Sequence, residues 1–178
     1  MLKWLLVLLV IAGTLLAWRV TAAGKRGLPR RGETLPEFSL PDQHGALRSD
    51  REFRGRWLVL YFYPRDDTPG CTEQAARFRD TMREFEAAGA AVCGVSVDDS
   101  ESHAEFARKY QLPFALLADR DGATARRYGS LLDLGVVRFA RRNTFLIDPQ
   151  GRIAGVWLGV SPARNAGDML KAIKEAQS

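Results

Sequence analysis

Two segments of the chain are apolar at nearly every position and therefore predict buried β-strands. Residues 57–63 are seven consecutive apolar or aromatic residues, and residues 90–97 are almost as apolar. A strand with one solvated face alternates between apolar and polar residues, whereas a strand covered on both faces does not. The two segments therefore indicate central strands of a layered α/β sheet.

Other segments repeat apolar residues at helical spacing. Between Cys71 and about Ala88 the repeated positions are Ala75, Phe78, Met82 and Phe85, which would share one helix face. Ser100–Tyr110 predicts a helix opened by Ser100 or Ser102 as its cap. The remaining predicted elements are strands at Phe38–Leu40, Phe114–Ala118, Asn143–Ile147 and Ile153–Leu158, and helices at Ala123–Tyr128 and Asn165–Ala176. The turn sequence at 148–151 joins two of these strands into a hairpin. This order predicts a three-layer α/β fold, with a mixed central sheet flanked by helices.

The N-terminal segment has a different character and predicts a separate leader. Trp4–Trp18 contains no charged residue, and continuing it to Ala23 gives a hydrophobic helix long enough for a membrane anchor, residues 4–23. The same residues also fit a cleaved signal peptide with small residues at 20–23. We favour the anchor and expect a membrane-associated protein with a single N-terminal span, or an exported one if the leader is cleaved. The side of the membrane stays open.

Charge divides at the end of this leader. The net charge of the chain is +5, but residues 1–32 hold six basic residues and no acidic one, so residues 33–178 carry a net charge of −1. We therefore divide the chain into a leader at 1–23, an exposed basic linker at 24–32 and a domain at 33–178. The domain has no electrostatic reason to bind nucleic acid. No Cys/His cluster has the spacing of a metal site, and His44 and His103 are expected to be solvated.

Cys71 is the strongest candidate for chemistry. It follows a buried strand and a polar loop, and it opens the first predicted helix. Free N–H groups and the positive end of the helix dipole favour a thiolate at such a position. Thr68 lies three residues earlier, so its hydroxyl can face the sulfur and hold a peroxide oxygen. Pro64 stiffens the loop, and Gly70 lets the backbone approach a substrate closely.

The residues 61–72, Tyr-Phe-Tyr-Pro-Arg-Asp-Asp-Thr-Pro-Gly-Cys-Thr, resemble the active-site loop of peroxiredoxins of the bacterioferritin-comigratory, or Q-type, branch. The segments 78–80, 112–114 and 142–148 match later blocks of that family in the same order. The resemblance implies a thioredoxin-like fold and a thiol-dependent peroxidase, active in antioxidant defence, that reduces hydrogen peroxide and organic hydroperoxides. It implies no metal, haem or other cofactor. It also assigns Arg142 to the sulfur, with Arg138 and Arg141 as close competitors.

The chain departs from the family at the resolving cysteine, which most members use to form a disulfide. The two common positions hold Ala76, and Phe106 or Ala107. Cys93 is the only other cysteine, and a role as a buried strand residue is favoured over a resolving role. We therefore expect a sulfenic acid at Cys71 that an external thiol, thioredoxin or a similar molecule, reduces.

Alternatives from other classes are weaker. A thiol–disulfide oxidoreductase would need a second cysteine where Thr68 stands. A membrane-tethered binding or metal-delivery module of the same fold would generally need two cysteines and a histidine together. The natural peroxide and the reductant are not specified by any motif, and we expect a monomer.

Overall fold

The computed structural model describes residues 27–178. The hydrophobic helix predicted in the leader, and most of the predicted linker, lie outside these residues. Residues 27–32 belong to the segment expected to be exposed, yet Pro29 is buried and Leu28 packs against the core. The reason is that both side chains are apolar and lie beside a sheet edge, where the Gly32 N–H donates to the Ile153 carbonyl over 2.8 Å. The domain boundary at residue 33 stays a prediction.

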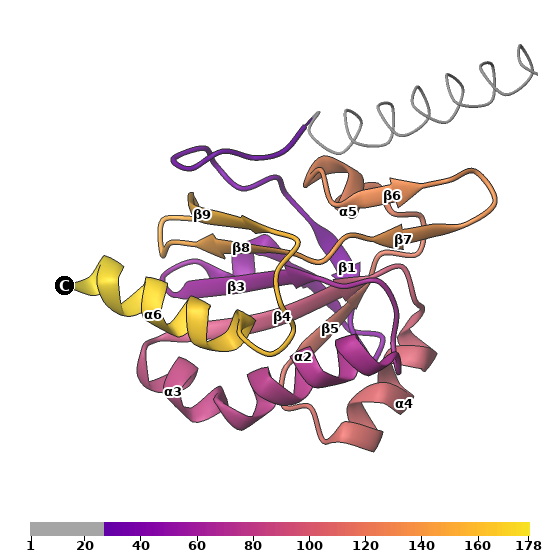
Figure 1. Ribbon diagram of the computed structural model, residues 1–178. Helices are drawn as coiled ribbons and strands as arrows, with labels where there is room; N and C mark the ends of the chain where they lie inside the picture. The colour runs from indigo at the N-terminus through magenta and orange to yellow at the C-terminus, as the bar shows by residue number, and fades with distance from the viewer. Residues whose placement is uncertain (1–26) are drawn as a thin grey trace, which may run out of the picture.

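A five-stranded mixed sheet forms the centre of the fold (Figure 1). Its strands, in spatial order, are β5 (Ala115–Ala118), β4 (Ala90–Ser96), β3 (Trp57–Phe62), β8 (Asn143–Ile147) and β9 (Ile153–Leu158). The first three are parallel, and β8 and β9 are antiparallel to their neighbours. Every residue of β4 is buried, as its unbroken apolar sequence predicted. The predicted α/β class with a mixed sheet between helices is confirmed.

Helices pack on both faces of this sheet. One face is covered by α2 (Pro69–Asp80), α3 (Met82–Ala87), α4 (Ser100–Tyr110) and α6 (Asn165–Gln177), which lie together in Figure 1. The other face is covered by the two-stranded sheet of β1 (Ser39–Pro41) and β2 (Leu47–Ser49), the 3-10 helix η1 (Asp50–Phe53) and α5 (Ala123–Arg127). A second two-stranded sheet joins β6 (Leu131–Asp133) to β7 (Arg138–Ala140).

Two separate cores result, because successive side chains of a strand point to opposite faces. In β3, Val59 and Tyr61 enter the core beneath α2 and α6, whereas Leu58 and Leu60 enter the core beneath η1 and α5. The first will be called the α2 core and the second the α5 core.

Two local predictions were wrong. The helix expected at 71–88 is interrupted at Thr81, where φ is −107° and ψ is 14°. Its β-branched side chain donates its hydroxyl to the Arg77 carbonyl over 2.7 Å, a bond that competes with the regular backbone ladder. The cap of α4 is Asp99, not a serine, because the Asp99 carboxylate accepts the Ser102 N–H over 3.0 Å.

Candidate active site

Cys71 is the third residue of α2 and lies at the carboxyl end of the central strands. Thr68 is the N-cap of this helix, and Pro69 occupies the first helical position, where its missing N–H costs nothing. The N–H of Cys71 is one of the first four of the helix, so it has no intrahelical partner. Cys71 is 1% exposed and belongs to the α2 core. The helix start therefore presents N–H groups and a positive dipole end to a sheltered sulfur.

Arg142 is the residue that the fold brings to this sulfur. It precedes β8, and its Nη2 donates to the Cys71 Sγ over 3.3 Å. Its backbone carbonyl accepts the Val160 N–H over 3.0 Å, which fixes the chain at this point. Arg138 instead faces Asp133, with its Nε 3.7 Å from a carboxylate oxygen. Of Arg138 and Arg142, it is Arg142 that contacts the sulfur, and its fixed positive charge stabilises a thiolate.

Three buried polar residues that were not predicted from the sequence form a hydrogen-bonded chain that ends on Arg142. Gln74 is fully buried; its Oε1 accepts from Arg142 Nη1 over 2.5 Å, and its Nε2 donates to Asn165 Oδ1 over 2.8 Å. Thr144 donates its hydroxyl to the same Asn165 oxygen over 2.9 Å. Gln74 follows Cys71 by three residues, so it lies on the same face of α2. That spacing was a usable signal, whereas nothing in the sequence points to Asn165.

Gly70 leaves room for the Arg142 guanidinium. A Cβ at this position would lie 3.3 Å from Arg142 Nη2 and 3.6 Å from Pro162 Cγ. The first distance is tighter than an ordinary van der Waals contact. The glycine therefore permits the close approach of Arg142 to the start of α2.

Thr68 and Pro64 lie on the loop that leads into α2, and both are half-buried. The Thr68 hydroxyl donates to the Arg65 carbonyl over 3.1 Å rather than to the sulfur. With its proton engaged in this way, the oxygen of Thr68 still has lone pairs with which to accept a hydrogen bond. The structure thus places Thr68 at the entrance to α2.

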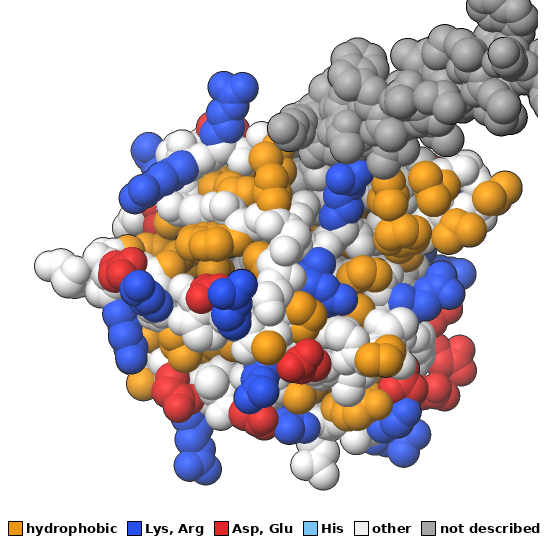
Figure 2. Space-filling view, viewed as in Figure 1, with side chains coloured by type: hydrophobic (Ala, Val, Ile, Leu, Met, Phe, Trp, Pro, Cys, Tyr) orange, Lys and Arg blue, Asp and Glu red, His pale blue; other side chains and the backbone are white. Residues whose placement is uncertain are grey.

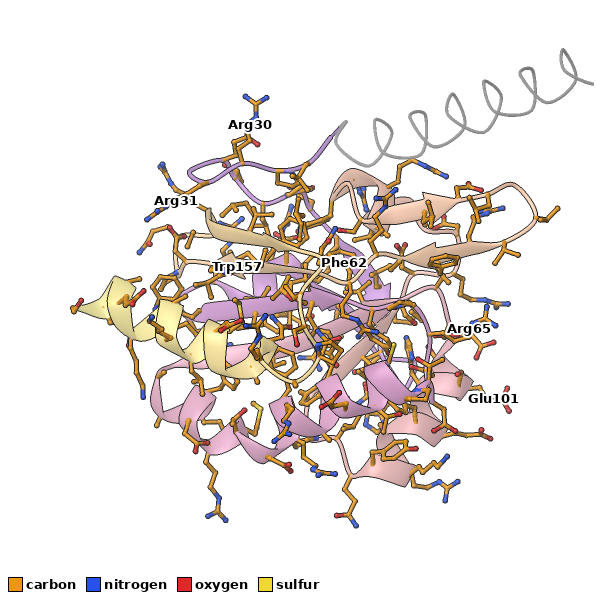
Figure 3. The ribbon with its side chains drawn as sticks, viewed as in Figure 1. Arg30, Arg31, Phe62, Arg65, Glu101 and Trp157 are labelled. Atoms are coloured by element: carbon orange, nitrogen blue, oxygen red, sulfur yellow. The ribbon has the colours of Figure 1, made fainter. Side chains whose placement is uncertain are left out.

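The loop is attached to α4 by two acidic residues. Asp66 is buried and accepts hydrogen bonds from Tyr63, Ser102 and His103, at 2.7, 2.8 and 2.8 Å. Asp67 has a positive φ of 54° and binds Lys109 and Tyr110. The hydrogen bond from Lys109 lowers the pKa of Asp67, and the hydrogen bond from Tyr110 lowers it by a smaller amount. Arg65 points to solvent at the same end of the molecule as Glu101 of α4 (Figure 3).

The expectation that His103 would be solvated was wrong. Its side chain is 0% exposed, and its Nδ1 lies 2.8 Å from an oxygen of Asp66. The polar sequence around it suggested a surface position, but α4 turns this one face toward the sheet. His44, by contrast, is exposed as expected.

Cys93 lies on the opposite side of the sheet from Cys71. Its side chain is in the α5 core, whereas Cys71 is in the α2 core. Burial raises the pKa of Cys93 to about 12, so its thiol stays protonated at neutral pH. Both thiols are free in the structure.

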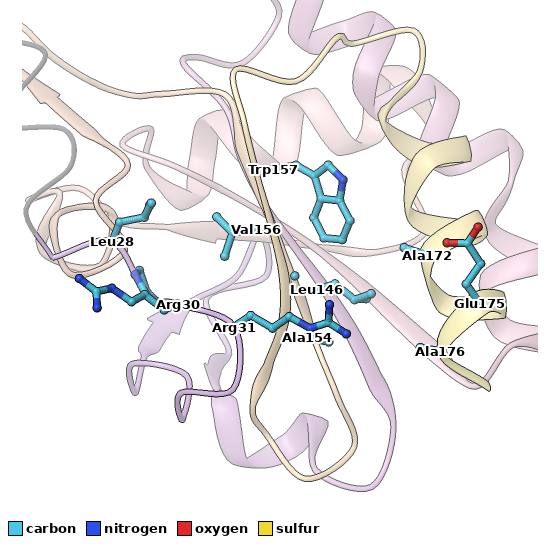
Figure 4. A pocket seen from close by; sticks show the side chains of 12 residues that line it. Leu28, Arg30, Arg31, Leu146, Ala154, Val156, Trp157, Ala172, Glu175 and Ala176 are labelled. Atoms are coloured by element: carbon cyan, nitrogen blue, oxygen red, sulfur yellow. The ribbon is translucent and has the colours of Figure 1, made fainter. Parts of the chain in front are cut away.

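A surface groove lies away from Cys71 (Figure 4). It measures about 630 Å³ and lies between β9 and α6, with Leu146, Val156 and Trp157 among its apolar lining and Arg30, Arg31 and Glu175 among its charged residues. It contains neither cysteine, so its lining offers no thiol nucleophile. On the face of the molecule seen in Figure 2, acidic and basic side chains are interspersed.

Comparison with known proteins identifies the family. The AhpC/TSA family profile matches residues 31–156. The chain belongs to the AhpC/TSA family. Within it, the chain is 42% identical over 132 residues to a putative peroxiredoxin bcp of Coxiella burnetii (strain RSA 493 / Nine Mile phase I), a match covering 71% of this chain and 86% of that protein. It is 40% identical over 149 residues to the chloroplastic peroxiredoxin Q of Oryza sativa subsp. japonica, covering 83% and 68%.

Solved structures of this family agree. Peroxidoxin BcpB from Mycobacterium tuberculosis superposes with a TM-score of 0.80 at 32% identity, covering 84% of this chain and 99% of that one. Peroxiredoxin Q of Xanthomonas campestris gives 0.76 at 34% identity, covering 83% and 99%. The predicted thioredoxin-like fold and the resemblance to the Q-type branch are confirmed. This family member is a peroxidase, an oxidoreductase whose substrates are a peroxide and a thiol reductant.

Two predictions made from the sequence fail, namely the membrane-associated location and the metal-delivery alternative. Between residues 27 and 178 no helix is long and apolar enough to cross a membrane, and the relatives include peroxiredoxins named as chloroplastic. These findings contradict the predicted membrane-associated location, which we withdraw; residues 4–23, on which it rested, lie outside the described residues. The metal-delivery alternative has no support either, since residues 27–178 contain no group of three side chains that could hold a metal ion.

Proposed function

We propose that Cys71 is the peroxidatic nucleophile of this peroxidase and that its substrates are hydrogen peroxide and organic hydroperoxides. The observation that carries the proposal is the contact between Arg142 Nη2 and Cys71 Sγ, 3.3 Å, at the start of α2. A buried thiolate beside a guanidinium and a helix N-terminus is a strong nucleophile held at a site of positive potential.

The first step is a displacement on oxygen. The thiolate of Cys71 attacks the terminal oxygen of the hydroperoxide, an S–O bond forms and the O–O bond breaks. The sulfur becomes a sulfenic acid, and the second oxygen leaves as an alkoxide or hydroxide that takes a proton from water. Arg142 stabilises the negative charge as it moves from sulfur to the departing oxygen.

The other predicted residues have supporting roles in this proposal. Thr68 accepts a hydrogen bond from the hydroperoxide, and the N–H groups at Gly70 and Cys71 bind its oxygens as the O–O bond lengthens. Pro64 limits the freedom of the loop through its fixed φ. Gln74 positions Arg142 through the bond to its Nη1.

We also propose that an external thiol, thioredoxin or a similar molecule, completes the cycle. Its thiolate attacks the sulfenic sulfur, an S–S bond forms and the S–O bond breaks, and the departing hydroxide takes a proton to become water. A second thiol then releases Cys71 from this mixed disulfide. The separation of Cys71 and Cys93 into two cores supports a cycle without an internal resolving cysteine. A disulfide would require their Cα atoms to come within about 7 Å.

One experiment tests both steps. The reduced protein is freed of reductant, treated with one equivalent of hydrogen peroxide and analysed by intact and peptide mass, with Cys71→Ser in parallel. We expect one added oxygen on the Cys71 peptide and none in the variant. A peptide linking Cys71 to Cys93 would replace the one-cysteine cycle by an internal disulfide. An unmodified Cys71 after seconds would contradict the peroxidase assignment of this residue.

A further inference from the structure

The loop from Pro64 to Gly70 is held in an unusual way. Between these two residues only Asp66 is buried; Arg65, Asp67 and Pro69 are exposed, and Thr68 is half-buried. The loop thus places no apolar side chain in the core, and its one buried side chain is a carboxylate. An apolar side chain would contribute through non-directional burial, whereas a buried carboxylate depends on hydrogen bonds of defined geometry.

Three side chains supply those hydrogen bonds. Tyr63 donates to Oδ1 of Asp66, and Ser102 and His103 are both 2.8 Å from Oδ2. Burial, together with the charge of Asp66, raises the pKa of Tyr63, so its hydroxyl keeps the proton that it donates. The backbone N–H of Asp66 donates to Asp98 over 2.9 Å. Through Asp66 the loop is therefore attached to the residue that follows β3, to the segment between β4 and α4, and to α4 itself.

His103 is the most enclosed of these donors. It is 0% exposed, and its Nε2 has no hydrogen-bond partner among the described residues. A proton on Nε2 would be a buried donor without an acceptor, which is costly. A carboxylate accepts hydrogen bonds, so the proton on Nδ1 is the one that His103 donates to Asp66.

We propose that His103 is a positioning residue, which, through Asp66, holds the loop that leads into α2 in place and so keeps the first turn of α2, with Cys71, sheltered and aligned for attack on peroxide. The inference rests on the proposed function of Cys71 and adds a control on access to it. Asp66 precedes Thr68 by two residues and Cys71 by five, so a displacement of Asp66 moves both. With Cys71 only 1% exposed, a reagent larger than a peroxide reaches the sulfur only when its surroundings open. The loop that leads into α2 is held by hydrogen bonds rather than by buried apolar side chains, so we infer that it is the part that opens.

The proposal makes a prediction that a purely electrostatic effect does not. Attack on peroxide needs the aligned, closed site, whereas alkylation by iodoacetamide needs an accessible sulfur. Both reactions use the thiolate, so a change in thiolate population would move both rates in the same direction. Loosening the loop instead raises the alkylation rate and lowers the rate of oxidation by peroxide.

The experiment uses the full chain with His103→Leu, which removes the donor, and His103→Asn, whose amide nitrogen can occupy the place of Nδ1. His44→Leu makes the same change at the exposed histidine and is the matched control. Alkylation of Cys71 and Cys93 is followed by peptide mass, and oxidation of Cys71 by quenched reaction with hydrogen peroxide. Cys93, buried in the other core, reports global unfolding.

For His103→Leu we expect the alkylation rate of Cys71 to rise about ten- to a hundredfold. Loss of one hydrogen bond to a buried carboxylate shifts the equilibrium between the closed and the open loop by about that factor. Peroxide oxidation should slow by at least about fivefold, because the loosened first turn of α2 no longer holds the reacting groups in line, and Cys93 should stay unreactive. His103→Asn should restore both rates toward those of the wild type. Unchanged rates in His103→Leu, rates that fall together, or an Asn variant as defective as the Leu variant would overturn the proposal.

A variant that unfolds is recognised by alkylation of Cys93, and Ser102→Ala then decides. This variant removes the other hydrogen bond to Oδ2 of Asp66, and Ser102 is partly exposed, so its replacement disturbs the core less. The same opposite shifts are expected, and unchanged rates would refute the role of this hydrogen-bonded group. If wild-type Cys71 does not react with peroxide but His103→Leu still exposes it to alkylation, the proposed function fails while the positioning role stands.

Discussion

Replacing Arg142 by methionine tests the contact on which the proposed chemistry depends. Methionine fills much of the same space but has no charge and no donor for the sulfur or for Gln74. At the observed Nη2–Sγ distance of 3.3 Å, a unit charge pair at an effective dielectric constant of 20 interacts by about 5 kcal/mol. Desolvation of both groups offsets much of this attraction, and hydrogen bonds to charged groups contribute about 1.5–3 kcal/mol net.

We therefore expect the second-order rate constant for Cys71 oxidation to fall about ten- to a hundredfold in Arg142→Met, since each 1.4 kcal/mol is worth a factor of ten. Rapid mixing with hydrogen peroxide, followed by an acid quench and peptide mass analysis, measures this rate constant for a single turnover without any reductant. Arg142→Lys retains the charge but not the planar guanidinium that contacts both the sulfur and Gln74. Its rate constant should lie between those of the wild type and of Arg142→Met.

Arg138→Met is the matched control, because Arg138 faces Asp133 and not the sulfur. Its oxidation rate should equal that of the wild type. A rate constant for Arg142→Met within threefold of the wild-type value, with the fold intact by circular dichroism, would refute the argument. It would mean that the helix N-terminus alone activates Cys71.

Three further measurements probe other parts of the structure. Gln74→Leu removes the acceptor that orients Arg142 and should slow Cys71 oxidation by about tenfold; an unchanged rate would show that Arg142 needs no such support. Burial raises the pKa of Cys93 to about 12, so roughly one thiol in a thousand is ionised at pH 9. Native protein should therefore show no alkylation of Cys93 from pH 6 to 9, and rapid modification near pH 8 would contradict its burial. Asp119 accepts the N–H groups of Thr124 and Ala125 at the start of α5, over 3.0 and 2.7 Å, so Asp119→Ala should lower the free energy of unfolding by about 2–3 kcal/mol and the Tm by about 5–10 °C; a thermal melt like that of the wild type would show that the two bonds contribute little.

Much of the architecture could be predicted because its signals are local. The apolar run at 57–63 became β3, and the helix predicted at Ser100–Tyr110 became α4 with those bounds, although its cap is Asp99 and not a serine. The strands β6 and β7 were not predicted, since three-residue strands are too short to show a period of two. Their pairing depends on contacts between segments that the sequence alone does not place together.

The candidate site divides in the same way. Cys71, Thr68 and Gly70 lie within four residues, so one loop and one helix start were enough to suggest them. Arg142 was assigned by resemblance, and only the packing of β8 against β3 shows why it is near the sulfur. Asn165 and His103 could not be found, because which face of a helix carries a buried polar group depends on partners from distant segments.

The division of the interior into two cores has a consequence for how an oxidised molecule would respond to its surroundings. With the sheet between Cys71 and Cys93, a sulfenic acid at Cys71 would find no partner within the described chain, and its lifetime would be set by the supply of outside thiol. A second peroxide would compete with that thiol and carry the sulfur on to the irreversible sulfinic acid. The balance between recovery and permanent inactivation would then follow the ratio of the peroxide concentration to the thiol concentration. The fraction of protein in the sulfinic form would therefore increase with each period in which peroxide exceeded the available thiol.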